Sequence, residues 1–295
     1  MMNDAGDAQA QAYRDGHVVV ADGLRLHYRD YPGSSDEPPL LCLPGLTRNV
    51  RDFDAFARLF APAHRVLALE FRGRGDSDYD PVPSRYVPLT YANDVIQLLD
   101  QLGIEKAIFV GTSLGGLVTM AVAMLNLDRI AAAVINDVGP QLNPVGLERI
   151  RTYVGGDARF RSWDEAAEAI ASNNGHVPPA YTHEDWVRMA RRVCREEHGL
   201  IRFDYDQAIA IPFETSGPAP TIDMWPLFKT LGQKPLLVLR GSLSDLLTSE
   251  GLEKMHEAVP AMRSATVSGV GHAPMLDEPE AVTAVDAFLR EISSR

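Results

Sequence analysis

Short apolar runs alternate with amphipathic stretches along most of the chain. Uninterrupted apolar runs predict strands buried on both faces at residues 39–43, 66–69, 107–110, 130–135 and 235–239. Between the second and third of these runs, residues 91–102 carry apolar side chains at helical spacing, and Gly103 ends the element. Strands that alternate with helices in this way predict a mostly parallel sheet with helices on both faces.

Two further elements extend this pattern toward the chain ends. Residues 17–20 and 24–28 flank an Asp22-Gly23 pair, which predicts a hairpin with a tight turn. Near the other end, apolar positions at helical spacing follow Pro279 up to Ile292, and proline suits the first turn of a helix.

The middle of the chain has a different pattern. Between residues 141 and 232 no buried strand is evident, and amphipathic helices are predicted instead at 147–153, 162–171, 185–197 and 224–231. We expect a helical cap inserted at 141–232 into a core domain formed by 1–140 and 233–295.

Length and composition agree with one large α/β domain that carries an insertion. The chain has 295 residues, of which 45% are hydrophobic and 23% charged, so a sizeable core can form. A net charge of -12 argues against nucleic acid as a partner and gives no reason to expect binding to anionic membranes. The polar N-terminal region and the lack of a long apolar stretch predict a cytoplasmic protein.

The segment Gly111-Thr112-Ser113-Leu114-Gly115 lies between the strand at 107–110 and an apolar segment at 116–125. This is the pattern of a nucleophile elbow, in which a serine sits on a strained turn and glycines let strand and helix approach. A glycine-rich turn without chemistry is the alternative, so the rest of the chain must supply a base, an acid and an oxyanion hole.

A serine hydroxyl needs a neighbouring imidazole to take its proton. His272 is the candidate base because it lies in a glycine-rich loop after the predicted strand around residue 266. Two aspartates at predicted strand ends are candidates for the acid that orients this imidazole. The chain order serine, aspartate, histidine favours Asp245, while Asp137 remains the alternative acid, with capping of the local turn as its other interpretation.

The oxyanion that forms during acyl transfer requires two N–H donors. One is expected from Leu114, at the start of the helix after the elbow, where the helix dipole favours negative charge. The other is expected from Leu46, in the turn at residues 43–47, and the hydroxyl of Thr47 is near the same place.

Together with the elbow, the loop Phe71-Arg72-Gly73-Arg74-Gly75-Asp76-Ser77 and the late Gly271-His272 resemble the α/β-hydrolase superfamily, in its capped single-domain form. The resemblance extends over residues 17–292. It implies an eight-stranded, mostly parallel sheet, catalytic Ser113, Asp245 and His272, and oxyanion donors Leu46 and Leu114.

A serine nucleophile implies an acyl-enzyme and therefore a carbonyl substrate. The leading hypothesis is hydrolysis of a small carboxylic ester with an apolar portion. Carbon–carbon hydrolysis of a vinylogous diketone, as in ring-cleavage pathways, ranks lower, because such relatives usually carry tryptophan where Ala273-Pro274-Met275 stands here. Lactone hydrolysis and a non-catalytic ligand-binding role remain as further alternatives.

No metal or organic cofactor is expected. The chain lacks a histidine–glutamate pair at ligand spacing and a dinucleotide fingerprint, and Cys42 and Cys194 lack metal-site spacing. Candidate pocket residues combine aromatic side chains of the cap with side chains near the elbow and the histidine. They are Thr47, Trp163, Trp186, Trp225 and Met275.

Overall fold

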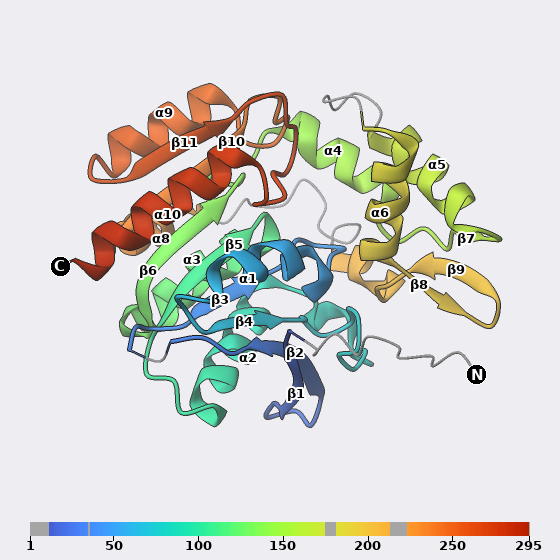
Figure 1. Ribbon diagram of the computed structural model, residues 1–295, viewed down its shortest axis with the longest axis horizontal. Coiled ribbons are helices and arrows are strands. Elements are labelled where there is room, and N and C mark those ends of the chain that lie inside the picture. Colours follow the sequence, from blue (N-terminus) through green and yellow to red (C-terminus); the bar gives the residue numbers. More distant parts are fainter. Residues whose placement is uncertain (1–11, 35, 175–180, 213–222, 295) are drawn as a thin grey trace, which may run out of the picture.

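An eight-stranded sheet forms the centre of the molecule (Figure 1). The computed structural model describes residues 12–34, 36–174, 181–212 and 223–294. In spatial order the strands are β1 (Arg14–Val19), β2 (Arg25–Tyr31), β4 (Val66–Leu69), β3 (Leu40–Leu43), β5 (Ala107–Thr112), β6 (Ile130–Asn136), β10 (Leu236–Gly241) and β11 (Arg263–Val267). Pairing is antiparallel from β1 to β4 and parallel from β4 onward, which confirms the predicted mostly parallel sheet.

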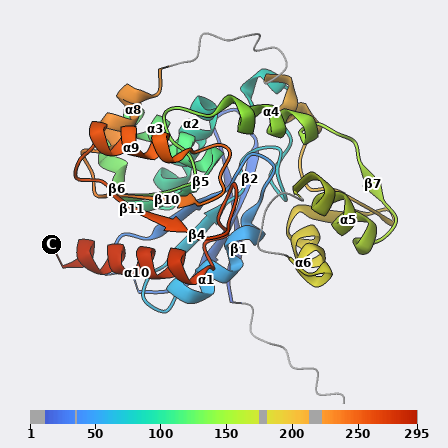
Figure 2. The ribbon, with the colours of Figure 1, turned by 90° about the horizontal axis from the view of Figure 1, so that it is seen from above.

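Helices cover both faces of this sheet, as Figure 2 shows. One face carries α1 (Asp54–Phe60) and α10 (Pro279–Ser293). The other carries α2 (Pro88–Gln101), α3 (Leu114–Asn126), α8 (Trp225–Leu231) and α9 (Ser249–Ala258). Short 3-10 turns complete the core at η1 (Val50–Phe53), η2 (Pro83–Arg85) and η3 (Leu127–Arg129). The continuous apolar runs of the strands allow both faces to be buried in this way.

The insertion between β6 and β10 contains strands as well as helices. Its helices are α4 (Pro144–Tyr153), α5 (Trp163–Asn174) and α6 (His183–Val193), followed by η4 (Gln207–Ala210). Its small antiparallel sheet has the order β7 (Arg159–Phe160), β9 (Leu200–Phe203) and β8 (Cys194–Glu197). Helices α5 and α6 and the small sheet lie at one end of the molecule, away from α9 and α10, and α4 lies between them and the core (Figure 1).

The prediction of a helix over residues 185–197 is wrong for its last four residues, which form β8. Residues 194–197 were expected to continue a helix, but a hairpin turn with positive φ at His198 and Gly199 pairs them with β9. Only one side of this small sheet packs on an apolar cluster, so its strands lack the continuous apolar runs that identify buried strands.

Helix α8 packs with the core rather than with the cap. Phe228 and Leu231 belong to the same buried cluster as the apolar face of α3, and α8 contacts α3 directly. The cap range predicted at 141–232 therefore includes helix α8, which packs with the core.

Buried ion pairs attach the small sheet of the cap to the core. Asp204, whose side chain is fully buried, accepts a hydrogen bond from Arg51 at 2.6 Å and pairs with Arg195 at 2.9 Å. Arg51 also donates to the carbonyls of Arg192 and Cys194 in the cap. A buried carboxylate held by two guanidinium groups fixes the cap against η1, because removing either partner would leave a charge without compensation.

The turn from β5 into α3 brings three backbones into close contact. A Cβ atom added at Gly115 would lie 2.1 Å from the carbonyl oxygen of Leu43 in β3. One added at Gly111 would lie 2.5 Å from the backbone of Gly115. Glycine is therefore required at both positions. Ser113, between them, has φ 51° and ψ -112°, the strained conformation expected of a nucleophile elbow.

Among the described residues, none of the helices is both long and apolar enough to cross a membrane.

Substitution Gly115→Ala should destabilise the fold, because its Cβ would force β3 and α3 apart. We expect the free energy of unfolding to fall by about 1–3 kcal/mol, measured by urea denaturation. Gly156→Ala is the matched control, since its Cβ would meet only the Tyr153 carbonyl at 3.8 Å. Equal unfolding midpoints for the two variants would contradict the close contact described here.

Candidate active site

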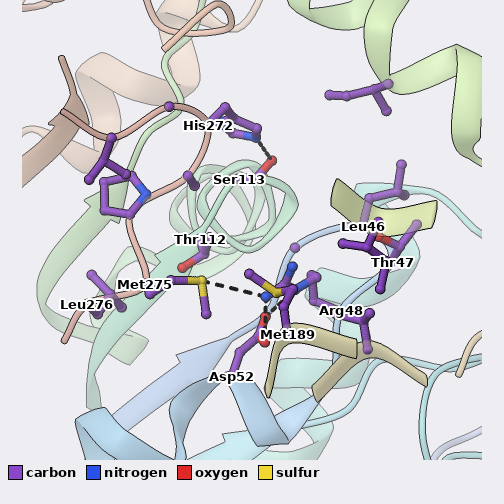
Figure 3. Close-up of a pocket in the computed structure, with 18 of the residues that line it drawn as sticks. Leu46, Thr47, Arg48, Asp52, Thr112, Ser113, Met189, His272, Met275 and Leu276 are labelled. Atoms are coloured by element: carbon purple, nitrogen blue, oxygen red, sulfur yellow. Dashed lines mark hydrogen bonds and ion pairs between the residues drawn. The ribbon is translucent and has the colours of Figure 1, made fainter. Parts of the chain in front are cut away.

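Ser113 and His272 are hydrogen-bonded to each other in the wall of a pocket (Figure 3). The elbow exposes the Ser113 hydroxyl above the carboxyl ends of the strands, and its Oγ lies 2.8 Å from His272 Nε2. The backbone N–H of Ser113 donates to the carbonyl of Asn136 at the end of β6, over 2.9 Å. The serine is thus tied both to the histidine and to the neighbouring strand.

The other ring nitrogen of His272 meets the carboxylate of Asp137. His272 Nδ1 lies 2.7 Å from Asp137 Oδ2, and the second oxygen, Oδ1, accepts from the N–H of Gly241 at 2.8 Å. The Asp137 side chain is fully buried, and that of His272 is 8% exposed. This pairing favours the tautomer with hydrogen on Nδ1, which leaves Nε2 free to take the serine proton.

The prediction that Asp245 is the partner of His272 is wrong, and the alternative, Asp137, holds that place. Asp245 faces Arg149 of helix α4, with Arg149 Nε 2.5 Å from Oδ2 and Nη2 2.9 Å from Oδ1. The hydrogen bonds from Arg149 hold the pKa of Asp245 below its usual value. Chain order favoured Asp245, but the end of β6 adjoins β5, so Asp137 follows the strand beside the elbow.

The loop after β3 passes beside the serine. A Cβ at Gly45 would lie 3.8 Å from Ser113 Cβ, so the backbone of this loop approaches Ser113 closely. The carbonyl of Leu46 accepts from Arg74 Nε at 2.9 Å, and Arg74 is fully buried. Leu114 is the first residue of α3, where backbone N–H groups have no acceptor within the helix. Leu46 and Leu114 remain the predicted oxyanion donors.

The anchoring role of Arg74 was not foreseen from the sequence, although its loop was recognised. Its Nη1 donates to the carbonyl of Arg72 at 2.7 Å and to the hydroxyl of Tyr91 at 2.9 Å. Its guanidinium thereby connects the loop after β4, helix α2 and the loop after β3. An arginine held on three sides can fix the orientation of the Leu46 peptide group.

Three of the predicted pocket residues line the pocket, and two lie elsewhere. Thr47, Trp186 and Met275 are in its wall. Trp163 packs on the cap cluster, with the Arg191 guanidinium 4.6 Å from its ring, and Trp225 packs against Phe228 beneath α8. The expectation for Trp163 and Trp225 is therefore wrong, because α5 and α8 direct these rings toward other surfaces.

Two charged residues of the pocket were missed in the sequence. Arg48 donates to Asp52 from Nε over 2.5 Å and from Nη2 over 2.7 Å, and both residues line the pocket. The signal available was an arginine and an aspartate four residues apart, directly after the loop that carries Leu46.

Within the described part of the chain, one group of side chains has metal-binding geometry: His27, Glu70 and Asp76. None of the three lines the pocket. His27 already binds Glu70 at 2.9 Å through Nδ1 and Asp15 at 2.8 Å through Nε2. These contacts explain the group as a partly buried polar network that joins the hairpin to the loop after β4.

Comparison with known proteins agrees with this geometry. The model of the family described as alpha/beta hydrolase matches residues 40–285, and the chain belongs to this family. It is 32% identical over 275 residues to a 3-hydroxybutyrate-oligomer hydrolase of Cupriavidus necator, covering 90% of this chain and 92% of that protein. It is 26% identical to Esterase YbfF of Escherichia coli, covering 88% of this chain and 95% of that one.

Among solved structures, an alpha/beta hydrolase from Novosphingobium aromaticivorans superposes with a TM-score of 0.90 at 49% identity, covering 95% of this chain and 98% of that one. An E-2-(acetamidomethylene)succinate hydrolase superposes with a TM-score of 0.80 at 23% identity, covering 94% of this chain and 99% of that one, and it supports the fold alone. Taken together, these relatives support an enzyme of the alpha/beta-hydrolase type.

Substitution Asp137→Asn should lower kcat for p-nitrophenyl butyrate by about 10³–10⁴-fold, because an amide at this place favours the wrong tautomer of His272. Asp245→Asn is the matched control and should lower kcat by less than about 10-fold, since Asp245 contacts Arg149 rather than the histidine. The reverse order of the two losses would return the acid role to Asp245.

Proposed function

We propose that this protein hydrolyses carboxylic esters through an acyl-enzyme on Ser113. The observation that carries the proposal is the continuous hydrogen-bonded series from Ser113 to His272 to Asp137, with distances of 2.8 and 2.7 Å, in the wall of a pocket. A hydroxyl, an imidazole and a buried carboxylate in this order form the arrangement that activates serine nucleophiles.

In the proposed mechanism, His272 Nε2 takes the proton of Ser113 as Oγ attacks the ester carbonyl. The tetrahedral oxyanion accepts hydrogen bonds from the N–H groups of Leu46 and Leu114. Protonated His272, stabilised by Asp137, then gives its proton to the departing alcohol. Water attacks the acyl-enzyme with His272 as base, the acid product leaves, and Ser113 recovers its proton.

The pocket supports a small substrate with an apolar portion. Much of its wall is aromatic or aliphatic, including Trp186, Met189 and Phe203 from the cap. Such walls exclude water and strengthen the polar interactions at the reacting carbonyl. Since the relative from Cupriavidus necator is a 3-hydroxybutyrate-oligomer hydrolase, short oligomers of hydroxy acids are among the esters proposed for this chain.

Substitution Ser113→Ala should abolish labelling by a fluorophosphonate probe and lower ester hydrolysis by about 10⁴-fold or more, because no other group supplies the nucleophile. The substrates to compare are p-nitrophenyl butyrate, a linear 3-hydroxybutyrate dimer, a lactone and a ring-cleavage dienone. Ser172→Ala is the control, since its exposed hydroxyl bonds the Ala169 carbonyl on the cap surface.

Equal labelling of the native protein and the Ser113→Ala variant would contradict the proposed nucleophile. A native protein that reacts with the probe and cleaves only the dienone or the lactone would replace ester hydrolysis by the corresponding reaction. A native protein that neither reacts with the probe nor cleaves any of the four would contradict the proposed function and favour the ligand-binding alternative.

A further inference from the structure

Arg48 and Asp52 form a rigid charged pair inside the pocket, apart from Ser113 and His272 (Figure 3). Their side chains are 24% and 13% exposed. Arg48 contacts Asp52 through one edge of the guanidinium, with Nε 2.5 Å from Oδ2 and Nη2 2.7 Å from Oδ1. None of the steps of ester hydrolysis described above uses this pair.

The opposite edge of the Arg48 guanidinium has little to bind. Among the described residues, Nη1 has no hydrogen-bond partner, and beyond Asp52 Nη2 meets only the sulfur of Met275, at 3.6 Å. A thioether is a weak acceptor, so the N–H groups of this edge remain available. Guanidinium groups present two edges that each match a carboxylate, and here one is taken and the other is directed at the pocket lining.

The guanidinium of Arg72 is paired in the same way as that of Arg48, but it binds carboxylates through Nη1 as well. Its Nε and Nη2 hold Asp94 at 2.8 and 2.6 Å, as Arg48 holds Asp52. Its Nη1 in addition binds Asp80 at 2.5 Å and Asp22 at 2.7 Å. Within this protein, then, a guanidinium already paired through its side edge binds further carboxylates through Nη1. At Arg48, which lines the pocket, Nη1 has no such partner among the described residues.

The surroundings of Arg48 suit an anion at this place. Tyr153 and Tyr181 line the pocket within electrostatic range of Arg48, and each carries a hydroxyl that can donate. Trp186, Met189 and Met275 supply apolar wall. A charge-assisted hydrogen bond gains strength where water is excluded, while Asp52 keeps the pocket without net charge when it holds no substrate.

We propose that Arg48 binds a carboxylate of the substrate, so that the preferred ester carries a second, ionised acid group away from the reacting carbonyl. Asp52 acts as a positioning residue that holds the guanidinium with its Nη1 edge toward the pocket. This inference rests on the proposed ester hydrolysis and specifies its substrate class, and Arg48 is its specificity-determining residue.

The test compares two esters of equal shape. Mono-p-nitrophenyl adipate carries a free carboxylate, and p-nitrophenyl methyl adipate carries a methyl ester in its place. The native enzyme should show a kcat/KM ratio of about 10- to 100-fold in favour of the free acid, the range expected for a charge-assisted hydrogen bond. The preference should reside mainly in KM, because Arg48 lies apart from the reacting atoms.

Arg48→Gln should remove this preference. Because that variant leaves Asp52 without its partner, the double variant Arg48→Gln/Asp52→Asn, which removes both charges, serves as the second measurement and should give the same ratio near one. Arg290→Gln, which makes the same charge change at an exposed position on α10, is the matched control and should keep the native ratio. The inference would be overturned if the native enzyme showed a kcat/KM ratio near one. It would also be overturned if the double variant kept the preference of the native enzyme for the free acid.

A binding measurement separates this inference from the proposed function. In the Ser113→Ala background, calorimetry should detect adipate but not dimethyl adipate, and the double variant should lose adipate binding. If the native protein cleaves no ester but this binding pattern is found, the proposed function is wrong and the carboxylate site stands. If esters are cleaved and adipate does not bind, the carboxylate site is wrong and the proposed function stands.

Discussion

The close contact of the first turn of α3 with β3 and β5 determines where the groups of the site lie. Glycines at 111 and 115 permit the contact, and Ser113, on the turn between them, has a positive φ. The same turn bonds Ser113 to Asn136, the residue before Asp137. Ser113 and Asp137 are thus positioned by one set of neighbouring strands, and His272 bonds to both.

Arginine–carboxylate pairs hold the loops and the cap in place around the site. Arg72 fixes the loop after β4 through Asp94 and Asp80, and Asp204 holds the cap to the core through two arginines. Buried pairs of this kind add little net stability compared with apolar packing, but they penalise every arrangement that separates them. They therefore suit loops and an inserted cap, whose backbones are not held by the ladders of the main sheet.

The sheet, the elbow and the histidine were predictable because each has a local signature: apolar runs, paired glycines and a glycine-rich loop. Asp137 was only an alternative, because the choice between two strand ends depends on which strand adjoins β5, a fact of sheet order that chain order does not contain. The small cap sheet and the true places of Trp163 and Trp225 depend on packing between distant segments. Arg48 and Asp52 resemble an ordinary helical ion pair until the pocket around them is seen.

The position of Asp137 directly after β6 affects the loop after β10, which carries Asp245. Because Asp137 meets His272, Asp245 is free to grip Arg149 on α4, the first helix of the insertion. The partner of His272 thus follows β6, whereas the partner of Arg149 follows β10. A substitution in that loop can therefore change how firmly α4 is held while leaving the partner of His272 untouched.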